Sequence, residues 1–428
     1  MVKRSLLLIM LFWGHTATAL DREHWQPVKV EIRGGPGSYE LYRGGKPYVV
    51  KGVGSSDYRL DLVRQYGGNS IRTWHVGDGS ILDAAHANGL TVALCLNMVR
   101  ERHGFDYDDE AAVRAQFEKM RRQVLEFRDH PALLAWIIGN ELNFDHTNPR
   151  VWDAVNDVSK MIHELDPNHP TTTALAGISD SMYQLIRTRA PDLDFLSVQV
   201  YGMLAILPRL FNEIDITMPL MVTEFGTVGH WETSQTAWGA PVELTSHEKA
   251  ANYLKGYREV ITPFKGRVIG SYAFLWGQKQ ERTPTWYGMF TPEGEITEAV
   301  DALHYAWKSA WPKNRSPALK QLLLNGKTAR DSVRLQAGEV YPAQVWVEDP
   351  DQDPVVYQWQ IMRESTATQV GGDKEYVPVS LPGLIEPAGN GRARVTAPRE
   401  PGAYRLFVYA RDPNRSAAHA NVPFFVDP

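Results

Sequence analysis

Two stretches of the chain, Trp136-Ile137-Ile138-Gly139-Asn140-Glu141 and Leu220-Met221-Val222-Thr223-Glu224-Phe225-Gly226, are apolar runs that each reach a glutamate at their end. Neither run alternates apolar with polar residues. A short run of this kind, bounded by turn residues, is typical of a strand that is buried on both faces, as in a parallel sheet. The two stretches therefore predict parallel strands, each of which places a carboxylate at its carboxyl end.

Six further runs of the same type flank these two, so the chain contains eight: residues 48–53, 70–74, 91–97, 134–141, 171–176, 195–201, 220–225 and 268–276. Amphipathic segments lie between them. Residues 113–127 and 151–165 each carry apolar side chains at offsets 0, 4, 7, 11 and 14, which is one stripe of a helix. A third stripe begins at Ile296 and ends before Pro312.

Eight strand–helix units between residues 47 and 312 fit the roughly 250 residues of a (β/α)₈ barrel. The competing fold is an open doubly wound sheet, which would carry a third glycine in the turn after its first strand, and residues 52–57 lack it. We therefore expect an α/β protein with a TIM barrel over residues 47–315, preceded by a β-hairpin within residues 20–46. A small all-β sandwich of immunoglobulin-like type is expected over residues 316–428, because short alternating strands there are separated by Pro, Gly and Asp.

The first 19 residues have the layout of a cleaved signal peptide. Lys3 and Arg4 precede an apolar run, and Ala17-Thr18-Ala19 supplies small residues for cleavage. The run is shorter than the roughly 18 residues needed to cross a bilayer. We thus expect a secreted or periplasmic protein with no membrane span in the mature chain.

Composition excludes several classes of function. The net charge of −5 offers no basic footprint for nucleic acid. The single cysteine, Cys95, excludes a disulfide within the chain and a CxxC site. No His-x-His pair on a strand suggests a metal centre, and the acidic turn 349–354 lacks the Gly and Glu of an EF-hand loop. We therefore expect neither a metal nor a cofactor.

In a barrel, functional side chains lie at the carboxyl ends of the strands. Glu141 and Glu224 take such positions on the fourth and seventh strands. One carboxyl that stays protonated and one that stays ionised are what cleavage of a glycosidic bond needs. The residues expected to bind substrate around them are Arg72, Trp74, Asn97, Asn140, Tyr201, Trp231, Trp276 and Trp286. Arg72 and Tyr201 are suited to hold Glu224 ionised, and the indoles are suited to pack on sugar rings.

Over about residues 47–312 this pattern resembles the retaining glycoside hydrolases of clan A, whose barrels carry catalytic glutamates at the ends of the fourth and seventh strands. The cellulase-like and family 2 barrels are the nearest branches. The resemblance implies that Glu141 is the acid/base and Glu224 the nucleophile of a β-glycosidase that acts on an oligosaccharide or polysaccharide. Many members carry a histidine where this chain has Gly139 or Gln199, and this difference concerns the choice of substrate.

Two other functions fit the same residues. A transglycosylase uses the same chemistry but transfers the sugar to a hydroxyl of another sugar, and a catalytically inactive envelope protein would only bind glycan. Sugar identity, linkage, endo or exo action, oligomeric state and the task of the sandwich do not follow from the sequence.

Overall fold

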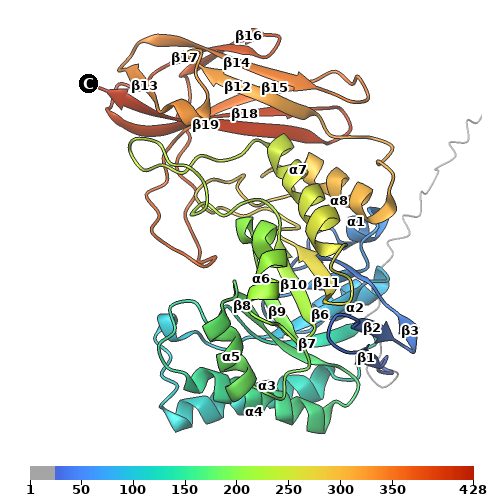
Figure 1. Cartoon of the computed structure of the whole chain (residues 1–428). Coiled ribbons are helices and arrows are strands. Elements are labelled where there is room, and N and C mark those ends of the chain that lie inside the picture. The colour runs from blue at the N-terminus through green and yellow to red at the C-terminus, as the bar shows by residue number, and fades with distance from the viewer. Residues whose placement is uncertain (1–24) are drawn as a thin grey trace, which may run out of the picture.

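The computed structural model of the chain describes residues 25–428 and consists of a barrel with a β-sandwich beside its open end (Figure 1). The predicted signal peptide, residues 1–19, lies outside the described residues. Among the described residues, none of the helices is both long and apolar enough to cross a membrane.

The barrel is closed by eight parallel strands in the order β10-β11-β4-β5-β6-β7-β8-β9. The strands are β4 (Val50–Gly54), β5 (Ser70–Arg72), β6 (Thr91–Leu96), β7 (Leu133–Asn140), β8 (Thr171–Ala176), β9 (Leu196–Gln199), β10 (Leu220–Phe225) and β11 (Val268–Ala273). Each of them falls on one of the eight apolar runs, so the predicted (β/α)₈ barrel is confirmed. The apolar runs form strands because the side chains of one face fill the barrel and those of the other pack under helices.

Helices follow the strands and cover the outside of the barrel (Figure 1). They are α1 (Leu60–Gln65), α2 (Ser80–Ala87), α3 (Glu110–Phe127), α4 (Arg150–Leu165), α5 (Asp180–Arg189), α6 (Leu207–Glu213), α7 (Ser246–Lys255) and α8 (Glu298–Lys308). Short 3₁₀ or π segments are η2 (Glu101–His103), η3 (Gly202–Ile206), η4 (Gly256–Ile261) and η5 (Ala329–Asp331). The predicted stripes correspond to α3, α4 and α8. Asp109 caps α3 by accepting hydrogen bonds from two backbone N–H groups of its first turn.

A three-stranded sheet of β1 (Val30–Arg33), β2 (Glu40–Arg43) and β3 (Lys46–Pro47) closes the amino-terminal end of the barrel. Val30 and Leu41 of this sheet share one buried cluster with inward-facing barrel residues such as Ala93, Cys95 and Met221. Cys95 is fully buried in this cluster, and burial raises the pKa of its thiol to about 11. The functional end of the barrel is consequently the opposite one.

The carboxyl-terminal part of the chain forms two four-stranded sheets. One has the order β12 (Ala318–Leu324), β14 (Val340–Glu348), β17 (Arg392–Thr396), β16 (Ile385–Gly389), and the other β13 (Val333–Gln336), β19 (Ala417–Asp427), β18 (Gly402–Arg411), β15 (Val356–Arg363). All pairs are antiparallel except β13 with β19. Buried residues of both sheets, among them Leu319, Val345, Leu406 and Val422, form one core. The predicted all-β sandwich is confirmed, and its immunoglobulin-like type stays a prediction.

A buried polar network joins the sandwich to the barrel. Glu243, in the long loop after β10, accepts hydrogen bonds from Lys249 Nζ at 2.5 Å and from Asn421 Nδ2 of the sandwich at 2.6 Å. Burial disfavours the charge of Glu243, but Lys249 and the further donors around it lower its pKa to about 2. Nearby, the guanidinium of Arg405 donates to the carbonyl of Pro241 at 2.6 Å. The two domains are therefore held together by charged groups that have no access to water.

Candidate active site

A cavity of about 500 Å³ opens at the carboxyl end of the barrel strands. Of the ten residues predicted for the site, it is lined by seven: Trp74, Asn140, Glu141, Tyr201, Glu224, Trp231 and Trp276. The two glutamates thus face one space, although they come from strands that are not neighbours in the barrel.

Glu224 lies within β10, nearly buried, and its carboxylate accepts hydrogen bonds on both oxygens. Arg72 and the indole N–H of Trp74 donate to Oε1, the latter at 2.9 Å. The hydroxyl of Tyr201 donates to Oε2 at 2.6 Å. Three donors, one of them a cation, stabilise the negative charge that a nucleophilic carboxylate needs.

Arg72 was expected among the substrate-binding residues and as the partner of Glu224, and the structure shows the contact with Glu224 but does not place Arg72 in the lining of the cavity. Its side chain is fully buried below the cavity, where it also donates to Oδ1 of Asn140 at 2.8 Å. Gln199 donates to the same oxygen at 2.6 Å. Since both donors take the oxygen end of the Asn140 amide, its nitrogen end is directed away from them. Arg72 thus contacts Glu224 and Asn140 from below the cavity, and substrate binding by Arg72 stays a prediction.

Glu141 follows the last residue of β7 and has φ +52°, a conformation that side chains other than glycine seldom adopt. Its N–H donates to the carbonyl of Ala174 at 2.7 Å, which helps to hold this conformation. Burial, together with the nearby negative charge of Glu224, raises the pKa of Glu141 to about 7. The cavity thus combines one carboxyl that keeps its proton near neutral pH with one carboxylate held by three donors.

Aromatic side chains build the floor and one side of the cavity. Trp276 is almost wholly buried and meets the ring of Phe290 edge-on at a centroid distance of 5.1 Å, whereas Phe274 and Tyr287 pack on each other at 5.5 Å. Trp231, in contrast, is 58 % exposed and meets the ring of Tyr201 edge-on at a centroid distance of 5.8 Å. An indole exposed at a cavity rim offers a flat apolar face to a ligand.

Two further residues that were predicted to contact substrate do not line the cavity. Asn97 is exposed and does not line the cavity, because it lies past the end of β6, where the strand no longer fixes the direction of a side chain. Trp286 is buried under the cavity wall and donates its N–H to the carbonyl of Val228 at 3.1 Å. The size and apolarity of a tryptophan side chain suit both a cavity wall and a buried core, and the sequence does not distinguish these two positions.

Several lining residues were not predicted. Arg100 lies beside Glu141 and donates from Nε to the carbonyl of Asn140 at 2.8 Å. Lys279 and Glu281 form an ion pair of 2.7 Å on the loop after β11. Burial raises the pKa of Glu281. Sandwich residues complete the lining, and no sequence signal pointed to them.

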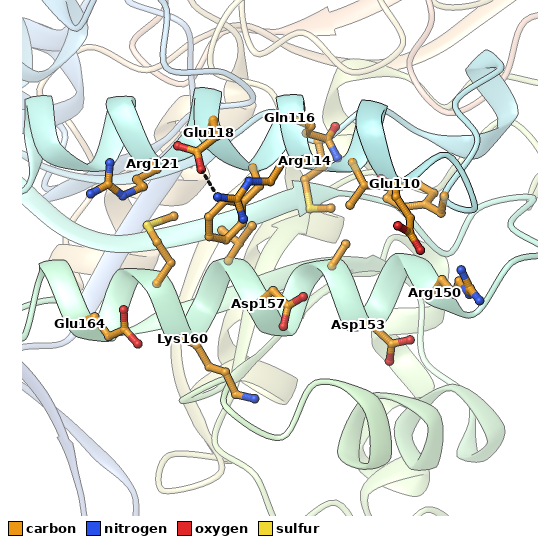
Figure 2. Close-up of a pocket in the computed structure, with 17 residues that line it drawn as sticks. Glu110, Arg114, Gln116, Glu118, Arg121, Arg150, Asp153, Asp157, Lys160 and Glu164 are labelled. Carbon is orange, nitrogen blue, oxygen red and sulfur yellow. Dashed lines mark ion pairs between the residues drawn. The ribbon is translucent and has the colours of Figure 1, made fainter.

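A larger cavity of about 990 Å³ lies elsewhere, between α3 and α4 on the outside of the barrel. Figure 2 shows charged side chains of both helices along it, including the Arg114–Glu118 ion pair of 2.9 Å. Neither glutamate of the predicted site lies in it. The smaller cavity is consequently the candidate active site.

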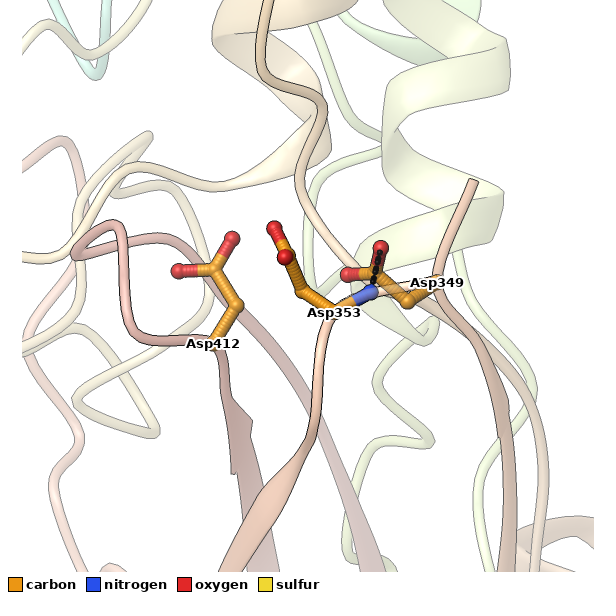
Figure 3. A group of neighbouring side chains, drawn as sticks. All are labelled: Asp349, Asp353 and Asp412. Carbon is orange, nitrogen blue, oxygen red and sulfur yellow. Dashed lines mark hydrogen bonds between the residues drawn. The ribbon is translucent and has the colours of Figure 1, made fainter. Parts of the chain in front are cut away.

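Among residues 25–428, one group of side chains has a donor set that suits a cation. The carboxylates of Asp349, Asp353 and Asp412 approach within 4.8 Å of one another in the sandwich (Figure 3). Local hydrogen bonds account for this arrangement, since Asp349 accepts from the N–H groups of Asp351 and Asp353 at 2.9 and 3.0 Å. Asp349 and Asp353 belong to the acidic turn expected from the sequence, whereas Asp412 follows β18, and none of the three lines the candidate active site.

No protein-family model and no curated protein matches the chain. Solved structures match its fold. The β-glucuronidase of Bifidobacterium dentium is 18 % identical, with a TM-score of 0.51 over 65 % of this chain and 49 % of that one. The β-glucuronidase of Dictyoglomus thermophilum is 19 % identical, with a TM-score of 0.50 over 67 % and 54 %. β-Glucuronidase 2 of Bacteroides uniformis, covalently bound to cyclophellitol-6-carboxylate aziridine, is 16 % identical with a TM-score of 0.50, over 93 % and 48 %.

The chain spans about half the length of these solved structures. Sequence identities below 20 % show a shared fold, whereas function depends on the residues of the site itself. The chain therefore shares the closed parallel barrel of these glycoside hydrolases.

Proposed function

We propose that the protein is a retaining β-glycosidase with Glu224 as nucleophile and Glu141 as acid/base. The observation that carries the proposal is the asymmetry of two carboxyls in one cavity. Glu224 accepts hydrogen bonds from Arg72, Trp74 and Tyr201, whereas burial and the charge of Glu224 raise the pKa of Glu141 to about 7. Retaining glycosidases need this division of roles.

In the first step, Glu224 attacks the anomeric carbon and the bond to the leaving oxygen breaks, while Glu141 gives that oxygen its proton. The product is an ester between the sugar and Glu224. Glu141, now ionised, takes a proton from water as the water oxygen attacks the anomeric carbon. The ester bond breaks, and both carboxyls return to their starting states.

The remaining lining has matching tasks. The amide nitrogen of Asn140 is oriented to donate to a sugar hydroxyl near the reacting carbon, and such bonds strengthen in an oxocarbenium-like transition state. Trp231, which is exposed, supplies an apolar face for a pyranose ring. The substrate is a β-linked glycan or glycoside. β-Glucuronides belong in the first panel tested, because the structural neighbours are β-glucuronidases.

A panel of 2-deoxy-2-fluoro β-glycosides tests this proposal by trapping the ester. We expect one sugar adduct on the peptide that contains Glu224, and none in Glu224→Gln. Glu213 follows an asparagine, as Glu141 does, but lies at the end of α6. Glu213→Gln is therefore the matched control, and it should be labelled like the wild type. An adduct on another residue, or hydrolysis of an aryl glycoside with inversion at the anomeric carbon, would contradict the proposal.

Export is a second, separate proposal that depends on residues 1–19. Amino-terminal sequencing of the protein recovered from the culture medium or periplasm should give a chain that starts at Leu20. Recovery of the uncleaved chain from the cytoplasm alone would contradict it.

A further inference from the structure

Two residues of the sandwich line the cavity of the barrel. Gly371 and Gly372 belong to the loop of residues 364–384, which joins β15 to β16. Figure 1 shows this loop, in orange-red, descending from the sandwich toward the barrel. The candidate active site is thus built by both domains.

One side of the loop tip is fastened to the barrel by Arg102, which lies in η2 between β6 and α3. Its guanidinium donates to both carboxylate oxygens of Asp373, at 2.7 and 3.0 Å, and to the carbonyl of Gly371 at 3.4 Å. His103 adds a contact to Asp373 at 3.3 Å. A two-pronged bond between Arg and a carboxylate fixes direction as well as distance.

The other side of the tip is fastened by the loop after β11. The backbone N–H of Arg282 donates to the buried carboxylate of Glu375 at 2.7 Å, and its guanidinium donates to the carbonyl of Gln369 at 3.0 Å. Lys279 donates to the carbonyl of Gly372 at 3.1 Å. The tip is therefore held at two separate points of the barrel rim.

The order of the strands determines which side of the cavity the tip closes. Arg102 follows β6, whereas Lys279 and Arg282 follow β11, and the barrel order places β4 and β5 between these two strands. Glu141, which follows β7, and Glu224 of β10 lie on the other side. A segment tied to β6 and β11 consequently bounds the cavity over β4 and β5.

The tip of the loop consists of two glycines, which have no side chains. Gly371 and Gly372 have φ +60° and +78°, which favour glycine. A Cβ on Gly371 would lie 2.9 Å from Nη2 of Arg102, and one on Gly372 would lie 3.1 Å from Nζ of Lys279. The left-handed backbone at both positions, more than the space around them, thus favours glycine at the tip.

We propose that the loop of residues 364–384 is a specificity-determining wall, which stops the glycan on the side of β4 and β5 and leaves it to extend from the reactive carboxyls in the opposite direction only. This inference rests on the function proposed above. Asp373 and Arg102 act as positioning residues for the wall, and substrates with further sugar units on the blocked side are excluded by it.

The test compares two specificity constants in wild type, Asp373→Ala and Arg102→Ala. They are kcat/KM for the best substrate among 4-nitrophenyl β-glucoside, galactoside, mannoside and glucuronide, and kcat/KM for β-linked oligosaccharides of that same sugar. We expect the ratio of oligosaccharide to aryl glycoside to rise about tenfold in each variant, since a charge-assisted pair holds the wall closed. The double variant should match the single ones, because both remove the same interaction.

Arg363→Ala is the matched control. It removes an Arg–carboxylate pair with Glu400 in the same domain, away from the cavity, and should leave the ratio unchanged. Asp373→Asn keeps the shape of the side chain and should raise the ratio by a smaller factor, and melting curves will show that the variants are folded.

The outcomes separate the two proposals. If Glu224 of the wild type is labelled but the ratio stays the same in Asp373→Ala, Asp373→Asn and Arg102→Ala, the wall is refuted and the proposed function stands. If the wild type neither hydrolyses the panel nor is labelled at Glu224, the proposed function fails and the wall fails with it.

Discussion

The protonation state of Glu141 predicts how the activity changes with pH. Burial and the charge of Glu224 raise the pKa of Glu141 to about 7 from an ordinary value of 4.5. Only the protonated form gives its proton to the leaving oxygen, so kcat/KM should be lost as the pH rises through about 7. Above that midpoint the protonated fraction falls tenfold per pH unit, which leaves about one tenth of the activity at pH 8 and about one hundredth at pH 9.

The assay is kcat/KM against pH for an aryl glycoside with a poor leaving group, in wild type and Glu141→Gln. In the variant the alkaline decline should disappear, and the rate should be low at every pH. With a 2,4-dinitrophenyl glycoside, whose leaving group needs no proton, the first step should survive the substitution and the sugar ester on Glu224 should accumulate. Because the charges of Glu141 and Glu224 interact, the midpoint of the pH profile is a property of the two carboxyls together.

A decline with the same midpoint in Glu141→Gln would refute the assignment of the acid, and so would a wild-type profile that stays flat to pH 9. The same group affects stability with a definite sign. A carboxyl whose pKa is raised on folding stabilises the folded state fully below pH 4.5, and this contribution is lost as the pH rises through about 7. Glu141→Gln should therefore raise the melting temperature above pH 7.

Three other outcomes are expected. Tyr201→Phe removes the hydroxyl that donates to Glu224 at 2.6 Å. Because a hydrogen bond to a charged group is worth about 1.5–3 kcal/mol, kcat/KM should fall by roughly 10- to 150-fold. An unchanged kcat/KM would show that this hydrogen bond does not matter in the transition state. Trp231→Ala removes an exposed indole and should raise KM more than it lowers kcat, and the reverse pattern in steady-state kinetics would contradict a binding role. Glu243→Gln leaves Lys249 charged and buried without its partner, and urea unfolding should show a loss of about 3–5 kcal/mol, which Lys249→Met in the same chain should partly restore. A loss below about 1 kcal/mol would mean that water reaches the domain interface.

The barrel could be predicted from the sequence because its strands are buried on both faces. Such strands have no polar alternation, and the limits of β8 and β10 could be set almost to the residue from composition alone. The position of Glu141 and Glu224 followed from the same rule, because parallel strands bring their carboxyl ends to one edge.

The directions of loop side chains could not be predicted. Trp231 and Trp286 both lie in loops after barrel strands, yet one is exposed at the cavity and the other is buried beneath it. Helical or strand periodicity, which assigns faces elsewhere, does not extend into such segments. The long loop after β10 shows the same limit, since Trp238 packs on Phe425 of the sandwich and Glu243 anchors the domain interface.

Contacts between segments that are far apart along the chain also could not be predicted from the sequence. Arg102 and Asp373 are 271 positions apart, and neither has a neighbour along the chain that indicates a partner. Only packing of the sandwich against the barrel brings them together, and domain packing follows from whole surfaces that a single sequence does not display.

The buried Cys95 has a practical consequence for following the loop of residues 364–384 in solution. Its thiol is the sole one in the chain, has no contact with water, and is poorly ionised, so alkylating reagents will not reach it in the native protein. A cysteine introduced at the exposed Thr368 would then be the one reactive sulfhydryl, and a fluorophore or spin label attached there would report whether the loop moves, without first removing Cys95.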